Sequence, residues 1–239
     1  MPSVDVVVPV YNEETDLPKN IPILHRFLSS DAFPYQWRII IADNASTDET
    51  PAVSQKLSQE LSNVAYTRIP QKGRGRALKA TWGQSQADIV SYMDVDLSTD
   101  LQAFPPLVKA VAEGGYDLAT GSRLARGART KRSLQREVLS RGYVFLIRLL
   151  FWTSLSDAQC GFKAARREAA QKLLPLIKDN NWFWDTEMLL LAQKLGMRVA
   201  EIPVRWQEDP NSTVQIRKTV LEDLRGLWRL RIEQPWRKK

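Results

Sequence analysis

The sequence predicts an α/β fold with a mostly parallel central sheet flanked by helices. Short runs rich in Val and Ile alternate with amphipathic helical patterns over the first hundred residues, which is typical of βαβ units with right-handed crossovers. Polar turns follow these runs, where the carboxyl ends of parallel strands would gather at one edge. With 239 residues, 44% of them hydrophobic, the chain is large enough for one such domain and a small extension.

The elements of the first half follow in a regular order. Strands are predicted at residues 5–10, 37–42, 64–69 and 89–93, and helices at 17–30, at 50–61 and from about residue 77. Asp43 follows the second strand, and Asp94 and Asp96 follow the fourth. A nucleotide crevice at that edge of the sheet is therefore the first expectation.

Asp94 and Asp96 are the strongest candidates for chemistry. Two carboxylates so close together repel each other unless a cation or hydrogen-bond donors offset the repulsion. A Mg²⁺ or Mn²⁺ ion that holds a diphosphate would do so, because these ions prefer oxygen ligands. The alternative is that both residues only shape a turn, since Asp, Ser and Thr favour turns and helix caps.

A basic, glycine-containing loop lies at residues 71–76, before the third predicted helix. Its glycines permit close approach of a ligand, and the following helix N-terminus favours anions. The loop lacks the spacing of an ATPase P-loop, and a solvated basic turn is the alternative.

The second half begins with a strand at 116–120 and then a strongly cationic segment that leads into an apolar helix at 138–152. The cations are Arg123, Arg126, Arg129, Lys131, Arg132, Arg136 and Arg141. Cations followed by an aromatic-rich helix are typical of an element at a membrane interface, although a core helix beside a solvated loop fits equally well. Further helices are predicted at 173–177 and 188–195, a strand at 199–206, and an amphipathic helix at 214–232 with a basic tail.

Composition narrows the function classes. The net charge of +7 indicates anionic partners. A single cysteine, Cys160, excludes an internal disulfide, and a single histidine, His25, argues against a histidine metal site. No run reaches the roughly 20 apolar residues of a membrane span, and the first residues lack a secretory pattern. We expect a cytoplasmic protein held peripherally at the cytoplasmic face of a membrane.

The order of motifs resembles the family 2 glycosyltransferases with a GT-A fold, most closely the dolichyl- and polyprenyl-phosphate mannosyl- and glucosyltransferases. The motifs are PVYNEE, IIADNASTDET, KGRGRALKATW, YMDVDLSTD, ATGSR, VLSRG, DAQCGFKA and WFWDTEMLLLA. The resemblance covers residues 4–206. It implies a GT-A domain at 1–206, with an acceptor loop and interfacial helix at 123–152, and a basic amphipathic extension at 207–239.

The resemblance also implies roles for individual residues. The donor would be bound by Pro9, Tyr11, Glu13, Asp43, Lys72, Gly73, Arg76 and Asp94, and the metal by Asp94 and Asp96. Asp96 and Arg123 would be catalytic, and the acceptor would be bound by Arg132, Arg136, Ser140 and Gln159. Asp185 and Glu187 stand where relatives keep a base, and here they either act so or orient other side chains, unless they only begin a helix.

The implied reaction is inverting, metal-dependent transfer of a hexose from GDP-mannose or UDP-glucose to a polyprenyl or dolichyl phosphate. A phosphate acceptor is already anionic near neutral pH, so it needs no general base. One alternative is a soluble sugar or protein hydroxyl as acceptor. Another is a basic nucleic-acid-binding domain, which we do not expect because no aromatic RNA-binding motif accompanies the cations.

Overall fold

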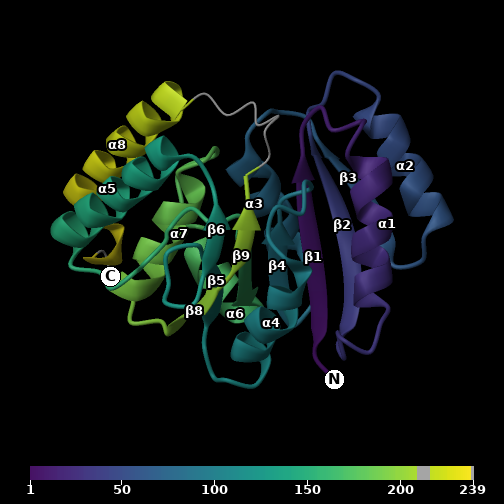
Figure 1. The fold of residues 1–239 in the computed structure, drawn as a ribbon, viewed down its shortest axis with the longest axis horizontal. Coiled ribbons are helices and arrows are strands. Elements are labelled where there is room, and N and C mark those ends of the chain that lie inside the picture. The colour runs from purple at the N-terminus through teal and green to yellow at the C-terminus, as the bar shows by residue number, and fades with distance from the viewer. Residues whose placement is uncertain (209–215, 238–239) are drawn as a thin grey trace.

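The computed structural model describes residues 1–208 and 216–237, with side chains omitted for 216–218. A central seven-stranded sheet has the order β3-β2-β1-β4-β7-β5-β8, and β6 pairs with β9 in a separate two-stranded sheet (Figure 1). The strands are β1 (Ser3–Val10), β2 (Gln36–Asn44), β3 (Val64–Ile69), β4 (Ile89–Met93), β5 (Leu118–Ser122), β6 (Arg129–Lys131), β7 (Phe162–Arg166), β8 (Val199–Pro203) and β9 (Arg205–Gln207). The helices are α1 (Leu17–Leu28), α2 (Thr50–Glu60), α3 (Arg74–Gln84), α4 (Phe104–Ala112), α5 (Leu134–Phe151), α6 (Arg167–Leu173), α7 (Trp184–Lys194) and α8 (Ile216–Glu233), with short 3₁₀ turns η1 (Leu101–Ala103) and η2 (Pro235–Arg237).

The predicted fold class is confirmed. All pairs in the main sheet are parallel except those of β7, which runs antiparallel between β4 and β5. Because side chains alternate along a strand, Val6 joins the core under α1 and α4, whereas Val7 joins the core under α3, α6 and α7. Helices cover both faces, which explains why the strands are apolar along most of their length.

Several predicted boundaries were wrong. Helix α3 begins at Arg74 rather than Ala77, because Gly73, at φ +149°, turns the chain directly into the helix. Helix α5 begins at Leu134, capped by the side chain of Ser133. In place of the helix predicted at 173–177, the structure has α6, which ends at residue 173. The single strand predicted at 199–206 is instead two strands, β8 and β9, which belong to different sheets. The predicted start of the last helix, 214–215, lies outside the described residues.

The small β6–β9 sheet connects the cationic segment to the loop after β4. Trp206 of β9 forms a bridge with Thr99, and Gln207 N donates to Ser98 O at 3.0 Å. On its other edge, β9 pairs in parallel with residues 129–131. The cationic segment is therefore held next to the loop that carries Asp94 and Asp96.

Helices α5 and α8 lie side by side on the flank of the molecule remote from β3 (Figure 1). Helix α5 buries only Val144, Ile147 and Phe151, so its apolar composition does not reflect burial on all sides. Among residues 1–208 and 216–237, no helix has the length and apolarity to cross a membrane.

Candidate functional site

The carboxyl ends of β1 and β2 meet the start of α3, as expected for a crevice at this edge. Gly73 N donates to Asn44 Oδ1 at 2.6 Å, and a Cβ at this glycine would lie 2.5 Å from Asn180 O. The Lys72 ammonium lies 3.5 Å from the ring centroid of Tyr11. Three residues predicted to bind the donor, Tyr11, Lys72 and Gly73, therefore lie at this edge.

For the other residues predicted to bind the donor, the structure shows contacts within the protein. Asp43 is fully buried and accepts hydrogen bonds from Ser46 N at 2.9 Å and Tyr66 Oη at 3.1 Å, so in this structure it organises the turn after β2. Glu13 N donates to a threonine hydroxyl of α2, and Arg76 N donates to Asn180 O. Pro9 lies in β1, paired with Ala42.

Asp94 and Asp96 line a small cleft together with Ser98 and Gly161. Asp94 accepts a hydrogen bond from Arg74 Nη2 at 2.8 Å, yet its side chain remains 43% exposed. Asp96 accepts from Ser98 N at 2.9 Å and from Ser98 Oγ at 2.5 Å. A Cβ at position 161 would lie 1.8 Å from Asp94 Oδ2, so only glycine permits this arrangement.

These two carboxylates have the donor chemistry that Mg²⁺ or Mn²⁺ requires. Within the described part of the chain, no group of three or more Asp, Glu, His or Cys residues could hold a metal. Two carboxylates can supply only part of a six-oxygen shell, so a metal here would need oxygens from a ligand. A diphosphate supplies such oxygens, and the residues therefore fit a shared metal.

Behind the cleft lies a buried network of charged residues centred on Asp185. Its carboxylate pairs with Arg74 Nη1 at 2.7 Å and Lys163 Nζ at 3.1 Å, and it accepts a hydrogen bond from Tyr92. Burial would raise the pKa of Asp185, but Lys163 and Arg74 outweigh burial and lower it. Asp185 thus remains ionised and fixes the guanidinium that contacts Asp94.

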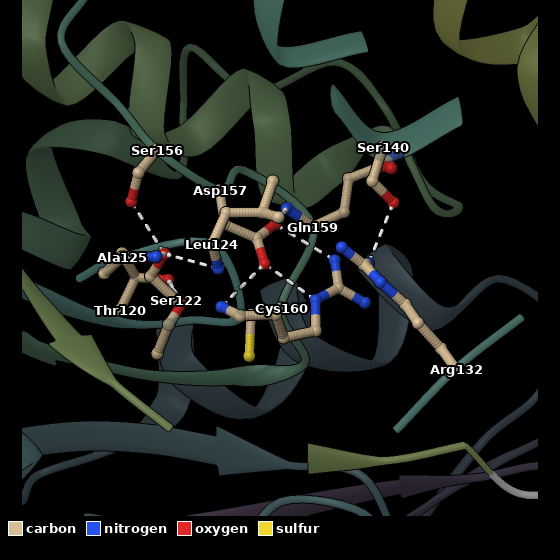
Figure 2. A network of polar contacts seen from close by, with 12 residues as sticks. Thr120, Ser122, Leu124, Ala125, Arg132, Ser140, Ser156, Asp157, Gln159 and Cys160 are labelled. Atoms are coloured by element: carbon tan, nitrogen blue, oxygen red, sulfur yellow. Dashed lines mark hydrogen bonds and ion pairs between the residues drawn. The ribbon is translucent and has the colours of Figure 1, made fainter. Parts of the chain in front are cut away.

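The turn at residues 157–161 holds Arg123. Asp157, which is labelled in Figure 2, accepts hydrogen bonds from Arg123 Nε at 2.7 Å and from Arg123 Nη2 at 3.0 Å. Burial opposes ionisation of Asp157, but the Arg123 charge lowers the pKa of its carboxyl to about 2. Glu201 of β8 supports the turn by accepting from Ser156 N at 2.8 Å and from Asp157 N at 3.2 Å. Within residues 1–208 and 216–237, Nη1 of Arg123 has no hydrogen-bond acceptor, so this donor is available.

The residues predicted to bind the acceptor lie along the start of α5. Arg132 donates to Glu137 at 2.6 Å and to Ser140 Oγ at 3.1 Å, the latter visible in Figure 2. Arg136 pairs with Glu208 at 2.9 Å. These ion pairs preorganise the arginines, and exposed cations at Arg126, Arg129 and Lys131 add to the positive charge of the segment.

Gln159 and Glu187 contact the C-terminal helix α8. Gln159 Nε2 donates to Asp223 Oδ2 at 2.6 Å, and Arg229 Nη2 pairs with the fully buried Glu187 at 3.0 Å. Asp223 is 4% exposed, and burial raises the pKa of its carboxyl to about 7. Glu187 therefore faces the interface between α7 and α8, where it orients Arg229.

We expect Asp223→Asn to stabilise the protein at pH 8 but much less at pH 5. Asp223 has a folded pKa of about 7 against an ordinary 3.8, so its protonation contributes stability that is lost as pH rises from about 4 to 7. Asparagine carries no charge, and it can keep the hydrogen bond to Gln159 if the side-chain amide of Gln159 flips. In urea unfolding, the free energy of unfolding of the variant minus that of wild type should increase by about 2–3 kcal/mol between pH 5 and pH 8. Parallel pH profiles for the two proteins would contradict this.

Sequence reasoning missed several residues that position the site. Each of them contacts a predicted site residue or the turn that holds one; they are Arg74, Asp157, Gly161, Lys163 and Glu201. Arg74 lies in the basic loop already singled out, but nothing in the motif distinguishes it from Arg76. Asp157 and Gly161 flank the predicted Gln159 within one motif, DAQCGF, which was a usable signal.

The chain is similar to known proteins over most of its length. The model of glycosyl transferase family 2 matches residues 5–174. Glycosyltransferase AglD of Haloferax volcanii is 38% identical over 96% of this chain, which spans only 38% of that protein. The dolichyl-phosphate beta-glucosyltransferase of Homo sapiens is 31% identical, with 94% of this chain and 77% of that protein covered.

Solved structures agree on the fold. Glucosyl-3-phosphoglycerate synthase from Mycobacterium tuberculosis, in complex with Mn²⁺, UDP-glucose and glycerol 3-phosphate, superposes with a TM-score of 0.70 at 17% identity, covering 96% of this chain and 80% of that one. The family model covers most of the chain, including the paired acids and the turn at 157–161. The chain belongs to glycosyl transferase family 2.

Proposed function

We propose that this glycosyltransferase moves glucose from UDP-glucose to a polyprenyl or dolichyl phosphate at a membrane surface. One observation carries the proposal: the turn at 157–161 holds Arg123 at one end and packs Gly161 against Asp94 at the other. An arginine suited to a phosphate thus lies beside carboxylates suited to a metal diphosphate. The names of the curated relatives support the acceptor and the sugar, and the UDP-glucose complex of the structural neighbour supports the donor.

At the donor side, the residues bind and orient a diphosphate. Asp94 and Asp96 would hold Mg²⁺ or Mn²⁺, which supplies electrostatic stabilisation of the leaving diphosphate. The ion pair with Arg74 holds the Asp94 carboxylate in position. Tyr11, Lys72 and Gly73 lie at the adjoining strand ends, where they can contact the nucleotide.

At the acceptor side, the residues bring two anions together. The second pKa of a phosphate monoester is about 6, so this nucleophile arrives deprotonated and needs no base. Arg123 would hold the phosphate through its remaining donors, assisted by Arg132, Arg136 and Ser140. Asp185 and Glu187 are buried and paired with cations, which suits an orienting role. Direct attack then inverts the anomeric centre.

The flank formed by α5 and α8 suits a lipid surface. Exposed apolar side chains recur every three, four or seven residues, so each helix presents them as a stripe. The stripes are Leu134, Val138, Phe145, Leu149 and Trp152 at α5, and Leu221, Leu224, Trp228 and Ile232 on α8. Such a surface places the acceptor loop, at the start of α5, next to the headgroups of a bilayer.

The proposal is tested with radiolabelled UDP-glucose, polyprenyl phosphate and Mn²⁺, followed by extraction into organic solvent. We expect counts in the organic phase, at least tenfold fewer with GDP-mannose as donor, and none with unphosphorylated polyprenol, because the phosphate is the nucleophile. The product should be the β-anomer by NMR. Counts that stay aqueous, or equal labelling of polyprenol, would reject a lipid phosphate as acceptor.

A further inference from the structure

A second cationic site lies at the C-terminal ends of α5 and α8, and none of the residues that line it lines the cleft of Asp94 and Asp96. An open cavity of about 180 Å³ lies where α5, α7 and η2 end. Three cations contribute to its lining, and among the described residues no carboxylate does. The cations are Lys194, Arg231 and Arg237, and they lie beside Phe151, Trp152, Gln234 and Trp236.

Aromatic packing gives the cavity a fixed wall. The ring of Trp236 lies edge-on to buried Phe151, with centroids 6.3 Å apart, and the Lys194 ammonium lies 6.0 Å from the Trp236 ring. Since η2 follows α8 directly, this packing holds the C-terminal turn against α5. The cations therefore lie on packed elements of the fold.

Helix dipoles explain only part of this positive charge. The ends of α5, α7 and α8 each carry about half a negative charge, which cations such as Lys194 and Arg231 complement. Three such ends sum to about −1.5, against +3 from the side chains. Among the described residues that line the open cavity, the positive charge therefore exceeds what the helix ends offset.

Both long helices end here in unusual backbone conformations. Trp152 has φ +53° and Gln234 has φ +41°, although glycine normally occupies this left-handed region. Both residues line the cavity, and Trp152 is 91% exposed. The Trp152 ring is therefore open to contact from outside the chain, directly beside the three cations.

We propose that this cavity binds the phosphate of an anionic bilayer lipid, distinct from the acceptor lipid, with Trp152 inserted beside it. Lys194, Arg231 and Arg237 supply the charge complementarity, and the adjoining stripes of α5 and α8 supply the apolar contact. Trp is favoured at the boundary between headgroups and acyl chains. This would fix the far end of the two-helix flank to the bilayer.

The test measures binding to phosphatidylcholine vesicles with and without phosphatidylglycerol. Arg231→Gln/Arg237→Gln removes two pocket cations, whereas the control Arg225→Gln/Arg26→Gln removes two exposed cations elsewhere, one on α8 and one on α1. Diffuse attraction to the bilayer is worth about 1 kcal/mol per cation, which amounts to about 30-fold for the two pocket cations and about fivefold for the control, where only Arg225 lies on the flank. We expect the pocket variant to lose more than about 100-fold, because a bound phosphate also loses its hydrogen-bond donors. A loss of about 30-fold or less for the pocket variant would show diffuse attraction and overturn the proposal.

A second measurement separates a lipid from free phosphate. Monomeric dihexanoyl-phosphatidylglycerol should produce a saturable change in tryptophan fluorescence that the pocket variant lacks, and inorganic phosphate at the same concentration should produce none. Saturation by inorganic phosphate, or no saturation by either, would overturn the proposal. Transfer to a water-soluble short-chain acceptor should be unchanged in the pocket variant, so this site and the proposed function fail independently.

Discussion

Replacing Asp96 by alanine is expected to reduce the turnover number by at least about 10²–10³-fold while the fold stays intact. Asp96 lines the cleft beside Asp94, and its loss would remove one of the two carboxylates found there among the described residues. The charge that develops on the leaving diphosphate would then lack its counter-ion. The measurement is kcat with labelled UDP-glucose at saturating Mn²⁺, together with circular dichroism and the thermal midpoint.

Asp100 offers a matched control for this experiment. It lies in the same loop and accepts a backbone hydrogen bond from Gln102 N at 3.0 Å, but it does not line the cleft. Asp100→Ala should cost some stability and little turnover. If Asp96→Ala retained near-normal kcat and a normal response to Mn²⁺, Asp96 would have no part in the mechanism.

The sequence predicted the fold class and the location of the site because both depend on local patterns. Alternating apolar runs identify β1 to β4, and the polar residues after each run must gather at one edge of a parallel sheet. Asp94 and Asp96 could therefore be placed without coordinates. The antiparallel position of β7 between β4 and β5 could not be predicted in this way, because the sequence of a five-residue strand carries no signal of its neighbours.

Partnerships between distant residues were beyond the reach of sequence patterns. Arg74 and Asp185 are 111 positions apart, and Arg123 and Asp157 are 34 apart. No spacing rule indicates that such residues meet, so the carboxylate that holds Arg123 could not be predicted. Likewise, Asp43 has the position expected for a donor-binding residue, but its burial depends on Tyr66 and the turn that it organises.

Asp185→Ala should be among the most destabilising substitutions in the protein. Arg74 is 9% exposed and Lys163 is fully buried, so loss of the carboxylate leaves two buried cations without their shared counter-ion. Breaking a buried pair in this way costs about 3–5 kcal/mol. Because the pKa of Asp185 is lowered, its contribution is present above about pH 4 and is lost as pH falls further. Urea unfolding of both proteins should therefore differ most near neutral pH and converge in acid.

The double variant Asp185→Ala/Lys163→Met separates support of the fold from positioning of the site. Arg74 keeps its ion pair with Asp94, so Lys163 is the cation that Asp185→Ala leaves without a carboxylate. Because the double variant removes Lys163 as well, we expect it to be more stable than Asp185→Ala alone by about 1 kcal/mol, as is typical of contacting pairs. Arg74, however, would still lack the partner that directs it to Asp94 at 2.8 Å. Transfer should consequently stay low even where stability returns, with a raised requirement for Mn²⁺. Recovery of transfer in step with stability would show that Asp185 serves only the fold.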